Sequence, residues 1–593
     1  MPVSPESGQS PERSSRAAAE AQHLADRAHD ALPRLAELTQ DQVDAIVDAM
    51  ATAAAGEAEA LAAAAVAETG YGVIADKIQK NLFAARDIHR FIRSMRTVGV
   101  IRRLDQQRVV EIAEPFGVVA AIVPSTNPTS TAIYKLLIAI KARCPIVLSP
   151  HPAAAGCVNR TVALMERAGR DAGMPRGAIG CLSEVSIEAT QALMTHRRVA
   201  VILATGGMGL VRAAYSAGKP AYGVGPGNAP AYIERSADVG KAVADIVTGK
   251  TFDNGLLCSS ENAVVVDTAI DDAVRNSFKA EGGCFLRPEE AAALADLLVT
   301  PQRLPNPACV GRDAMTIARK AGFGVPRGTR VLLAPLDGVG RDYPLSIEKL
   351  CPVLAYYVVD DWRDGCERCK ELLRYGGMGH TMAIHSRDEA VILEFGLKKP
   401  AFRIVVNTPT TLGSIGMTTG LDPSMTLGCG GWGGNITSDN ISPRHLLNIK
   451  RLAYETRPAP RTGRSDGAAD AVASPDGTLT GPDAMDAHSA ATSDSGAHSG
   501  GLNASGLDAR VVADRVDALL TKGDRAPLGG APITPPPPES EAVPFVCEDD
   551  VRAAFRDSRR IVIGPHTIVT PAARDLAERH QVFVETDATR DGR

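Results

Sequence analysis

Apolar residues recur at helical spacing through the first hundred residues of the chain. The alanine-rich stretch Ala17–Leu35 shows this spacing, Asp41–Val66 repeats it, and Ala75–Met95 continues it. Apolar positions three or four residues apart place an apolar face along a helix, so the pattern predicts three helices. Residues 1–16 are instead rich in serine and proline, a composition that predicts disorder.

The pattern changes to that of strands at residue 98. Val98–Glu114 alternates in the manner of a β-hairpin. After residue 117 the predicted strands are 118–123, 146–148, 179–182 and 199–203, and the helices between and after them are 130–142, 157–172, 187–194 and 208–217. This alternation predicts a parallel sheet with helices on both faces, so the fold class is α/β. Ligands in such folds bind beyond the carboxyl ends of strands, where Pro124–Asn127 and Thr205–Gly207 would lie.

A second α/β region follows, and the composition then changes. We expect one doubly wound domain at 17–236 and 428–456, and a second at 237–427. A site is expected in the cleft where the chain crosses between two such domains. The remainder is a largely disordered extension, divided into a linker at 457–506, an amphipathic helix at 507–522, a proline-rich linker at 523–544 and a small α/β module at 545–593.

The segment Leu507–Lys522 carries its apolar residues on one helical stripe. The stripe consists of Leu507, Val511, Val512, Val516, Leu519 and Leu520. Because two linkers flank the segment, it cannot bury this stripe alone and is expected to dock onto another surface. Packing back onto its own oligomer is the alternative. A membrane-surface role is disfavoured, since the polar face is not predominantly basic.

Composition and charge exclude several classes of function. The formal net charge is -5 and the sequence pI is about 6.2, which argues against a nucleic-acid-binding surface. No run of about 18 apolar residues predicts a membrane span, and no signal peptide is expected at the N-terminus. The 11 cysteines show no disulfide spacing, so a reducing cytoplasm is expected.

Three short motifs suggest chemistry that their surroundings do not support. Cys366 and Cys369 form a C-x-x-C pair in a helical stretch, but no second pair completes a zinc site, so we predict no metal. Gly249-Lys250-Thr251 imitates a P-loop whose first glycine is an alanine here. Gly223-x-Gly225-x-Gly227 imitates a dinucleotide fingerprint, yet the strand Ala229–Ile233 follows where a helix should begin.

A lone thiol, Cys258, lies on a stretch of small and polar residues between two regular elements. A helical apolar run ends at Phe252, and the strand-like run Ala263–Val266 follows. A thiol on such a turn can be exposed and aimed, which is how an enzyme presents a nucleophile. A buried structural cysteine is the alternative that the local sequence leaves open.

Residues 100–455 carry a series of motifs that resembles the aldehyde dehydrogenase superfamily, and within it the CoA-acylating branch. The motifs are Glu114–Val118, Val123–Thr131, Ala204–Gly207, Gly223–Asn228, Phe252–Glu261, Glu348–Val353, Gly379–Thr381 and Leu427–Gly430. That branch includes the aldehyde dehydrogenase half of bifunctional alcohol/aldehyde dehydrogenases, and the propionaldehyde and sulfoacetaldehyde dehydrogenases. The resemblance implies that the hairpin at about 98–114 contributes to the surface of a homodimer or homotetramer.

The resemblance also assigns the catalytic roles. Cys258 is implied to attack an aldehyde, and the amide of Asn127 with the backbone N–H of Cys258 to bind the resulting oxyanion. From local sequence alone, an asparagine before Pro128 is typical of a turn. His380 is implied in CoA binding or in proton transfer near neutral pH, with a structural hydrogen bond as the alternative.

The fate of the thioester on Cys258 separates the branches of the superfamily. Hydrolytic members carry a general-base glutamate at the position that matches Gly223, and no carboxylate follows here until Glu234. Because water then lacks a base, the resemblance implies that coenzyme A accepts the acyl group. Three alternatives remain. The chain could be a hydrolytic aldehyde dehydrogenase, a phosphate-reductase relative of the glutamate-5-semialdehyde dehydrogenase type, or a scaffold protein with an inactive dehydrogenase fold.

A nicotinamide cofactor is implied as well. Gly206 and Gly207 follow a strand and precede a helix, the arrangement that binds a pyrophosphate. Glu348 matches the glutamate that contacts the nicotinamide ribose, although alone it would be a solvated loop charge. The other cofactor-binding candidates are Ser125, Thr126, Ser149, His151, Thr205, Gly225 and Pro352. NAD is expected, with some tolerance of NADP because no acid in Ser149–Pro152 would repel a 2′-phosphate.

The tail implies a location for the enzyme. Leu507–Lys522 resembles the short helices that attach enzymes to the shells of bacterial microcompartments, and residues 568–575 loosely resemble modules on other proteins of that kind. We therefore expect the chain to lie in the cytoplasm, within such a compartment. Its expected partners are a shell protein and its substrates, a small aldehyde and CoA. The sequence does not name the aldehyde, and short aliphatic aldehydes are usual in the branch.

Overall fold

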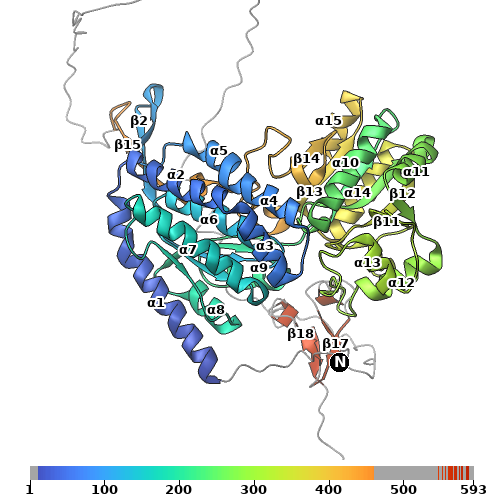
Figure 1. Cartoon of the computed structure of the whole chain (residues 1–593), viewed down its shortest axis with the longest axis horizontal. Helices are drawn as coiled ribbons and strands as arrows, with labels where there is room; N and C mark the ends of the chain where they lie inside the picture. The colour runs from blue at the N-terminus through green and yellow to red at the C-terminus, as the bar shows by residue number, and fades with distance from the viewer. Residues whose placement is uncertain are drawn as a thin grey trace, which may run out of the picture. The chain divides into compact units, whose positions relative to one another are not determined.

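The computed structural model describes residues 11–459 continuously, together with short segments between residues 545 and 585. The chain divides into two compact units, residues 1–465 and 466–593. Within the first unit, Figure 1 shows the blue and cyan elements gathered around one sheet and the green and yellow elements around another. The predicted linkers from 460 to 544, and with them Leu507–Lys522, lie outside the described residues.

The chain begins with four helices, α1 Pro11–Ala36, α2 Gln40–Gly56, α3 Ala58–Thr69 and α4 Ile74–Leu82. The single helix predicted at 41–66 is two helices that meet at an angle of 62°, because Gly56 is a poor helix former and Glu57 leaves the helical conformation. The prediction of disorder for residues 1–16 is wrong for residues 11–16, which belong to α1.

Helix α4 does not stop at Leu82. It widens into a π-helical turn, η1 Phe83–Ile88, and continues as α5 His89–Arg93. Such turns are found frequently at functional sites. The apolar spacing predicted one uninterrupted helix over 75–95, since one widened turn changes a short apolar stripe very little.

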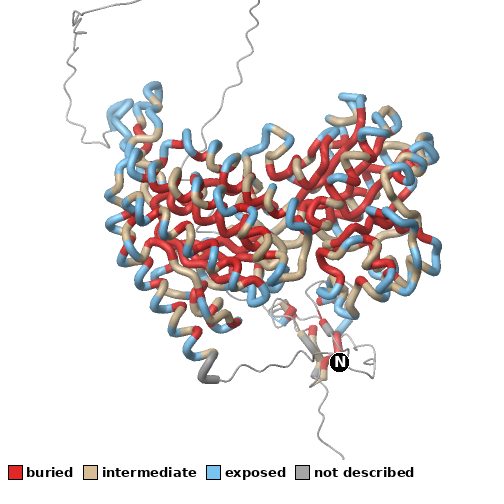
Figure 2. Tube along the Cα trace, in the orientation of Figure 1, coloured by how far each residue is buried: buried red, intermediate tan, exposed pale blue. Residues whose placement is uncertain are grey.

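The hairpin predicted at 98–114 forms as β1 Gly99–Leu104 and β2 Val109–Pro115. Strand β2 also pairs with β15 Leu447–Ala453, so the three strands make an antiparallel sheet. Most residues of β1 and β15 are at least partly exposed, and the hairpin tip is pale blue at the upper left of Figure 2. This sheet therefore offers surface on the outside of the first unit.

A five-stranded parallel sheet is the centre of the first region, in the order β5-β4-β3-β6-β7. The strands are β3 Val118–Val123, β4 Ile146–Pro150, β5 Ile179–Cys181, β6 Val199–Thr205 and β7 Ala221–Val224. The helices between them are α6 Pro128–Lys141, α7 Ala155–Asp171, α8 Ile187–Thr195 and α9 Met208–Tyr215. Two apolar clusters cover the sheet, as the red strands of Figure 2 indicate. The strand order reverses between β3 and β6, so the loops after these strands diverge and leave room for a ligand.

A seven-stranded parallel sheet is the centre of the second region, in the order β10-β11-β12-β9-β8-β13-β14. The strands are β8 Ala229–Ile233, β9 Glu261–Asp267, β10 Gly283–Phe285, β11 Val331–Pro335, β12 Val353–Val359, β13 Gly379–His385 and β14 Ala401–Val406. The main helices are α10 Val239–Thr251, α11 Asp271–Ala280, α12 Pro288–Leu298, α13 Ala314–Lys320, α14 Trp362–Tyr375 and α15 Glu389–Leu397. Strand β8 pairs with β9 and β13, so the predicted domain boundary at 236 is wrong. The crossing occurs before β8, at the glycine-rich segment 225–228.

The C-x-x-C pair lies on α14, as expected. Cys366 and Cys369 are buried in the apolar cluster on one face of the second sheet. In the part of the chain that the structure describes, no group of three or more His, Cys, Asp or Glu side chains could hold a metal ion. Nor does any single helix there have the length and apolar character needed to cross a membrane; the bent pair α2 and α3 meets those criteria only when taken together.

The second unit contains short parallel pairings. Strand β16 Phe545–Val546 pairs with β18 Ile568–Val569, and β17 Ile561–Ile563 pairs with β19 Phe583–Glu585. The strands predicted at 561–563 and 582–585 are thus confirmed within one residue. Buried apolar side chains from these strands and their neighbours form a small cluster of their own.

Candidate active site

Cys258 lies on the turn between α10 and β9. A short 3-10 segment, Phe252–Gly255, begins this turn, and its residues Asp253 and Asn254 adopt left-handed conformations with φ of 50° and 55°. Cys258 is half-buried, whereas Ser259 and Ser260 beside it are buried, and their hydroxyls have no hydrogen-bond partner among the residues that the structure describes. The turn therefore presents the sulfur while it keeps the rest of the segment inside.

The surroundings of Cys258 keep its thiol protonated. Burial, helped by the nearby Glu348 and Cys429, raises the pKa of the thiol to about 12. The Arg403 guanidinium acts in the opposite direction and lowers this pKa. Arg403 is itself buried on β14, where it donates to the carbonyls of Gly428 at 2.5 Å and Ser438 at 3.0 Å. Arg403 is the cation on this side of the site that favours a thiolate.

Asn127 ends the loop after β3 and stands at the N-cap position of α6. Asparagine at this position usually caps the helix with its side chain, but here it makes no capping bond. The amide nitrogen instead lies 3.2 Å from Thr126 Oγ1 and 3.3 Å from the carbonyl oxygen of Leu256, two residues before Cys258. The structure thus brings the predicted oxyanion donor to the cysteine turn.

Glu348 and His380 approach the same place around Gly227. The carboxylate of Glu348 accepts the Gly227 backbone N–H at 3.0 Å. A side chain at residue 227 would have its Cβ 2.1 Å from the Cys258 carbonyl oxygen and 3.2 Å from the His380 ring. Only glycine fits here, because a Cβ would overlap the cysteine backbone. Gly227 therefore lets these three residues converge.

His380 is buried on β13 and is not a titrating group near neutral pH. Burial and the neighbouring Arg403 lower its pKa to about 3. Its Nδ1 lies 2.9 Å from Thr381 Oγ1, while Nε2 is buried with no hydrogen-bond partner in the described structure. This environment favours a neutral hydrogen-bonding role for His380 over a role that depends on a change of charge near pH 7.

The carboxyl edge of the first sheet fits a dinucleotide. Thr205 ends β6, and its buried hydroxyl has no hydrogen-bond partner in the described part of the chain. Gly207 follows as the N-cap of α9, with open space where a Cβ would be. A Cβ on Gly225 would lie 2.9 Å from Met208 Sδ. An unpaired hydroxyl, an open glycine and a helix N-terminus suit a pyrophosphate.

The remaining predicted cofactor residues have different surroundings. Ser125 and Thr126 are half-buried on the loop after β3, and His151 is exposed after β4. Ser149 is buried, and its hydroxyl lies 2.8 Å from Thr190 Oγ1. Pro352 is buried, and its carbonyl accepts the Leu332 N–H at 3.0 Å. The side chains of these last two residues are thus part of the protein interior.

Gly223 lies on β7 beneath helix α9. A Cβ at this position would be 2.9 Å from Val211 Cγ1 and 3.0 Å from the Tyr215 ring. The Tyr215 hydroxyl pairs with both backbone groups of Gly223, at 3.1 Å from the nitrogen and 3.2 Å from the oxygen. Helix α9 therefore fills the space that a larger side chain at residue 223 would occupy.

The sequence profile of the aldehyde dehydrogenase family matches residues 3–282. The bifunctional aldehyde-alcohol dehydrogenase AdhE of Escherichia coli K12 is 44% identical over 440 residues, which cover 73% of this chain and 49% of AdhE. The succinate-semialdehyde dehydrogenase (acetylating) of Clostridium kluyveri is 37% identical over 436 residues, covering 74% of this chain and 96% of that protein. The chain spans about half the length of the bifunctional relatives it matches.

Solved structures of aldehyde dehydrogenases are also similar to this chain. An acetylating aldehyde dehydrogenase from Geobacillus thermoglucosidasius has 48% identity and a TM-score of 0.75, and the match covers 76% of this chain and 99% of the other. A propionaldehyde dehydrogenase from the fucose utilisation microcompartment of Clostridium phytofermentans has 28% identity and a TM-score of 0.67, covering 73% and 97%. This chain belongs to the aldehyde dehydrogenase family. The predicted family and its fold of two α/β sheets are confirmed.

Several residues around this aldehyde dehydrogenase site were not predicted. Lys77 and Lys80 on α4 and Asp253 on the cysteine turn form a buried cluster that contacts Asn127 and Thr126. Arg403 was missed as well. Charged residues are rarely buried, so the sequence pattern places such side chains on solvent-exposed faces. Only the closeness of Asp253 to Cys258 in sequence could have pointed to this cluster.

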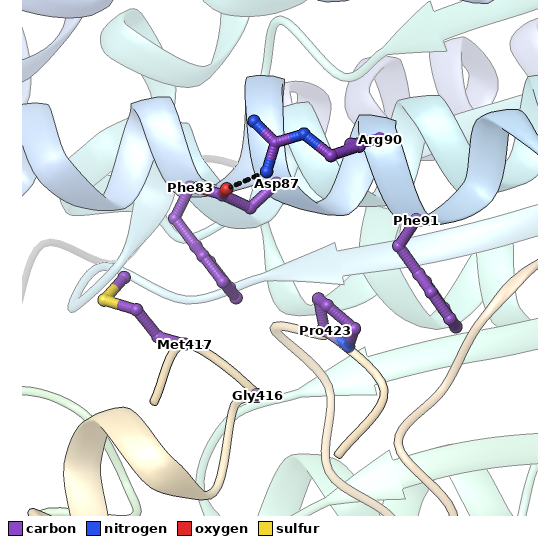
Figure 3. A pocket seen from close by; sticks show the side chains of 7 residues that line it. All are labelled: Phe83, Asp87, Arg90, Phe91, Gly416, Met417 and Pro423. Carbon is purple, nitrogen blue, oxygen red and sulfur yellow. Dashed lines mark hydrogen bonds and ion pairs between the residues drawn. The ribbon is translucent and has the colours of Figure 1, made fainter. Parts of the chain in front are cut away.

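A pocket of about 380 Å³ opens one helical turn beyond Lys80. Figure 3 shows Phe83 and Phe91 projecting from the same side of the helix, with Pro423 between them in this view and Met417 near Phe83. Arg90 also lines the pocket, but it is paired with Asp87 at 2.9 Å. The aldehyde dehydrogenase fold thus places an aromatic and aliphatic pocket with a neutralised charged pair next to the elements that hold Asn127.

Proposed function

We propose that this chain is an NAD-dependent aldehyde dehydrogenase that transfers the acyl group from Cys258 to coenzyme A. The observation that carries the proposal is the environment of Gly223. Hydrolysis of a thioester needs a base for water, and the position that would supply it is a glycine closed off by Tyr215 and Val211. The names of the relatives, acetylating in both Clostridium kluyveri and Geobacillus thermoglucosidasius, support the same choice.

The first step falls to Cys258 and Asn127. The sulfur, once deprotonated, bonds to the aldehyde carbon, and the carbonyl electrons move onto the oxygen. The Asn127 amide N–H and the Cys258 backbone N–H stabilise this oxyanion, and neither donor carries a charge that would trap it. When the oxyanion collapses to a carbonyl, the aldehyde hydrogen leaves with its electron pair and the acyl group remains on sulfur. A bound nicotinamide cofactor supplies the acceptor for that hydride.

The second step regenerates the thiol. The CoA thiolate bonds to the acyl carbon, the carbon–sulfur bond to Cys258 breaks, and Cys258 regains a proton. Because His380 is neutral and buried beside the cysteine backbone, we assign it a hydrogen-bonding role here in place of a proton-transfer role. The hydrolytic alternative would need a carboxylate at residue 223, and a scaffold with an idle fold would not need Cys258, Asn127 and Glu348 together.

The cofactor is held by the carboxyl edge of the first sheet in this proposal. Thr205, Gly206 and Gly207 would hold the pyrophosphate, Gly225 would border it, and the Glu348 carboxylate would accept hydrogen bonds from the nicotinamide ribose. Ser125, Thr126 and His151 complete the binding surface. We propose NAD as the cofactor, and NADP is tolerated because no acid follows β4 to repel a 2′-phosphate.

The substrate in this proposal is a short, uncharged aliphatic aldehyde. The pocket beside α4 is lined by Phe83, Phe91, Met417 and Pro423, and its guanidinium, Arg90, is already paired with Asp87. Among the residues that line the pocket, a carboxylate or sulfonate would find no cation that lacks an acidic partner. The ratio of kcat/KM for propionaldehyde to that for succinate semialdehyde tests this choice, and a preference for the acidic aldehyde would contradict it.

Two further proposals concern assembly. The exposed sheet of β1, β2 and β15 forms the contact of a homodimer or homotetramer, and Leu507–Lys522 attaches the enzyme to a bacterial microcompartment shell. The microcompartment relative from Clostridium phytofermentans supports the second proposal. Residues 500–525 fused to a fluorescent protein should form puncta in cells with such compartments. Diffuse fluorescence beside a punctate full-length enzyme would contradict it.

The decisive test of the activity is NADH absorbance with propionaldehyde, with and without CoA. Steady-state NADH formation should require CoA, and propionyl-CoA with NADH should run backward to the aldehyde. Rapid turnover without CoA would establish a hydrolytic enzyme. An absence of turnover with any short aldehyde, NAD or NADP, and CoA would favour the scaffold.

A further inference from the structure

A buried charged cluster joins helix α4 to the two loops of the active site. Lys77 and Lys80 are 2% and 1% exposed, and Asp253 on the cysteine turn is fully buried. Lys77 Nζ lies 3.0 Å from Asp253 Oδ2 and 3.1 Å from the Thr126 carbonyl oxygen. Lys80 Nζ bonds to the same Asp253 carboxylate and, at 2.5 Å, to Asn127 Oδ1. The cluster therefore touches both the oxyanion loop and the nucleophile turn.

The backbone around the cluster is shaped to hold Asp253. Asp253 adopts a left-handed conformation, which costs free energy for a residue other than glycine unless its surroundings fix it. The other Asp253 carboxylate oxygen accepts the Val73 N–H at 2.7 Å, and the Asp253 N–H donates to Asp76 at 2.7 Å. A Cβ on Gly72 would lie only 2.0 Å from the Asp253 carboxylate. These contacts keep one carboxylate in place between the two lysines.

The chemistry of an ammonium group decides how the Asn127 amide is turned. Lys80 Nζ has three hydrogens to donate and no lone pair, so the Asn127 atom that faces it must be the oxygen. The amide N–H groups then point to the opposite side, toward the Leu256 carbonyl and the cysteine turn. The helix cap would otherwise compete for this side chain, yet Asn127 makes no capping bond.

We infer that Lys80, held by Asp253, is a positioning residue for catalysis, which turns the Asn127 amide so that its N–H groups face the oxyanion formed at Cys258. A cation bonded to the amide oxygen also withdraws electron density from the nitrogen, so each N–H becomes a stronger donor. Lys80 acts only through Asn127 and does not touch the substrate. This inference rests on the proposed function, since it concerns the oxyanion of that reaction.

A double-mutant cycle tests the inference. Replacing Asn127 by alanine removes a donor and should lower kcat by about 10²- to 10³-fold. Lys80→Met should lower kcat by a similar factor, with the KM values for NAD and CoA changed less than about threefold. In the Asn127→Ala background, Lys80→Met should cost less than about threefold more, because the group it positions is absent. Lys80→Gln keeps a donor without charge and should retain an intermediate kcat.

The matched control is Lys141. This lysine is also fully buried and donates to the Asp44 carboxylate, but it lies away from Asn127. Lys141→Met should lower kcat equally in both backgrounds or not at all. Lys80→Met and Lys80→Gln are expected to fold, since Asp253 keeps its ion pair with Lys77. The inference would be overturned if a Lys80 variant lowered kcat by the same factor in the wild-type and Asn127→Ala backgrounds. It would also be overturned if both Lys80 variants kept the wild-type kcat. Wild-type kcat in Asn127→Ala would instead overturn the proposed oxyanion role itself.

Discussion

The Tyr215 hydroxyl is hydrogen-bonded to both the N–H and the C=O of Gly223, so helix α9 closes the strand position that the proposed function matches to the base of hydrolytic aldehyde dehydrogenases. The Tyr215 ring thereby fills the space that a side chain at residue 223 would need. The consequence for engineering is that a water-activating carboxylate cannot be restored by one substitution.

Gly223→Glu is therefore expected to destabilise the enzyme and not to convert it into a hydrolase. Overpacking against Val211 and burial of a carboxylate should together cost about 3 kcal/mol or more of unfolding free energy. Urea denaturation measures this cost, and NADH formation without CoA measures hydrolysis. Gly209→Ala, on the same helix and with open space at its Cβ, should be neutral or stabilising by up to about 1 kcal/mol. A well-folded Gly223→Glu enzyme that turns over without CoA would contradict this assignment.

Cys258→Ala should abolish turnover while the fold and nucleotide binding are retained. The acyl intermediate requires this sulfur, and the thiol is only half-buried, so its loss leaves a small cavity. Calorimetry with NAD and thermal denaturation check binding and folding. Cys284→Ala is the control, because Cys284 is a half-buried thiol on β10 that should not affect kcat. CoA-dependent activity in Cys258→Ala would exclude the covalent mechanism.

The alkylation of Cys258 should report its raised pKa. With a pKa of about 12 and no cofactor present, only a very small thiolate fraction exists at pH 7. The rate of inactivation by iodoacetamide should thus rise about tenfold per pH unit up to pH 10 without reaching a plateau. The inactivation rate across pH 7–10 is the measurement, with the Cys258→Ala variant as the blank for other thiols. A plateau near pH 8 would show that the resting thiol is already activated.

Glu348→Gln should change both stability and nucleotide binding with pH. Burial raises the pKa of Glu348 to about 7, above its ordinary value of 4.5. The folded state thus binds its proton more tightly than the unfolded state, and stability is lost as pH rises from 4.5 through 7. At pH 8 the glutamine variant should melt at a higher temperature than wild type without nucleotide, and at pH 4.5 the two should match.

The same variant should bind NAD more weakly at pH 8, because it lacks the carboxylate that we propose to accept the ribose hydroxyls. The KM for NAD of the wild-type enzyme should fall as pH rises through 7, and this step should vanish in Glu348→Gln. An unchanged melting temperature at pH 8 would show that the carboxylate is not buried as described, whereas an unchanged KM would remove Glu348 from the cofactor site.

The sequence predicted most of the elements because strand and helix periods alternate clearly from residue 118 onward. Through the family motifs it also predicted that Cys258 and Asn127 share a site, and the Asn127 amide nitrogen lies 3.3 Å from the carbonyl oxygen of Leu256, two residues before Cys258. It did not predict the crossing of β8 into the second sheet, since Ala229–Ile233 has the same apolar character as the strands of either sheet. It missed Lys77 and Lys80, because their burial depends on a carboxylate more than 170 residues away in sequence.

The π-helical turn η1 also bears on alignments of this chain with its relatives. One widened turn is what results when a single residue is inserted into an α-helix. Without it, every residue after Ile88 would rotate by about 100° around the helix axis, and Phe91 would leave the pocket that Phe83 shares with it. A relative one residue shorter between Lys80 and Phe91 would keep its charged cluster but lose this aromatic pair. Among relatives, the length of this helix should therefore predict the range of substrates better than overall sequence identity does.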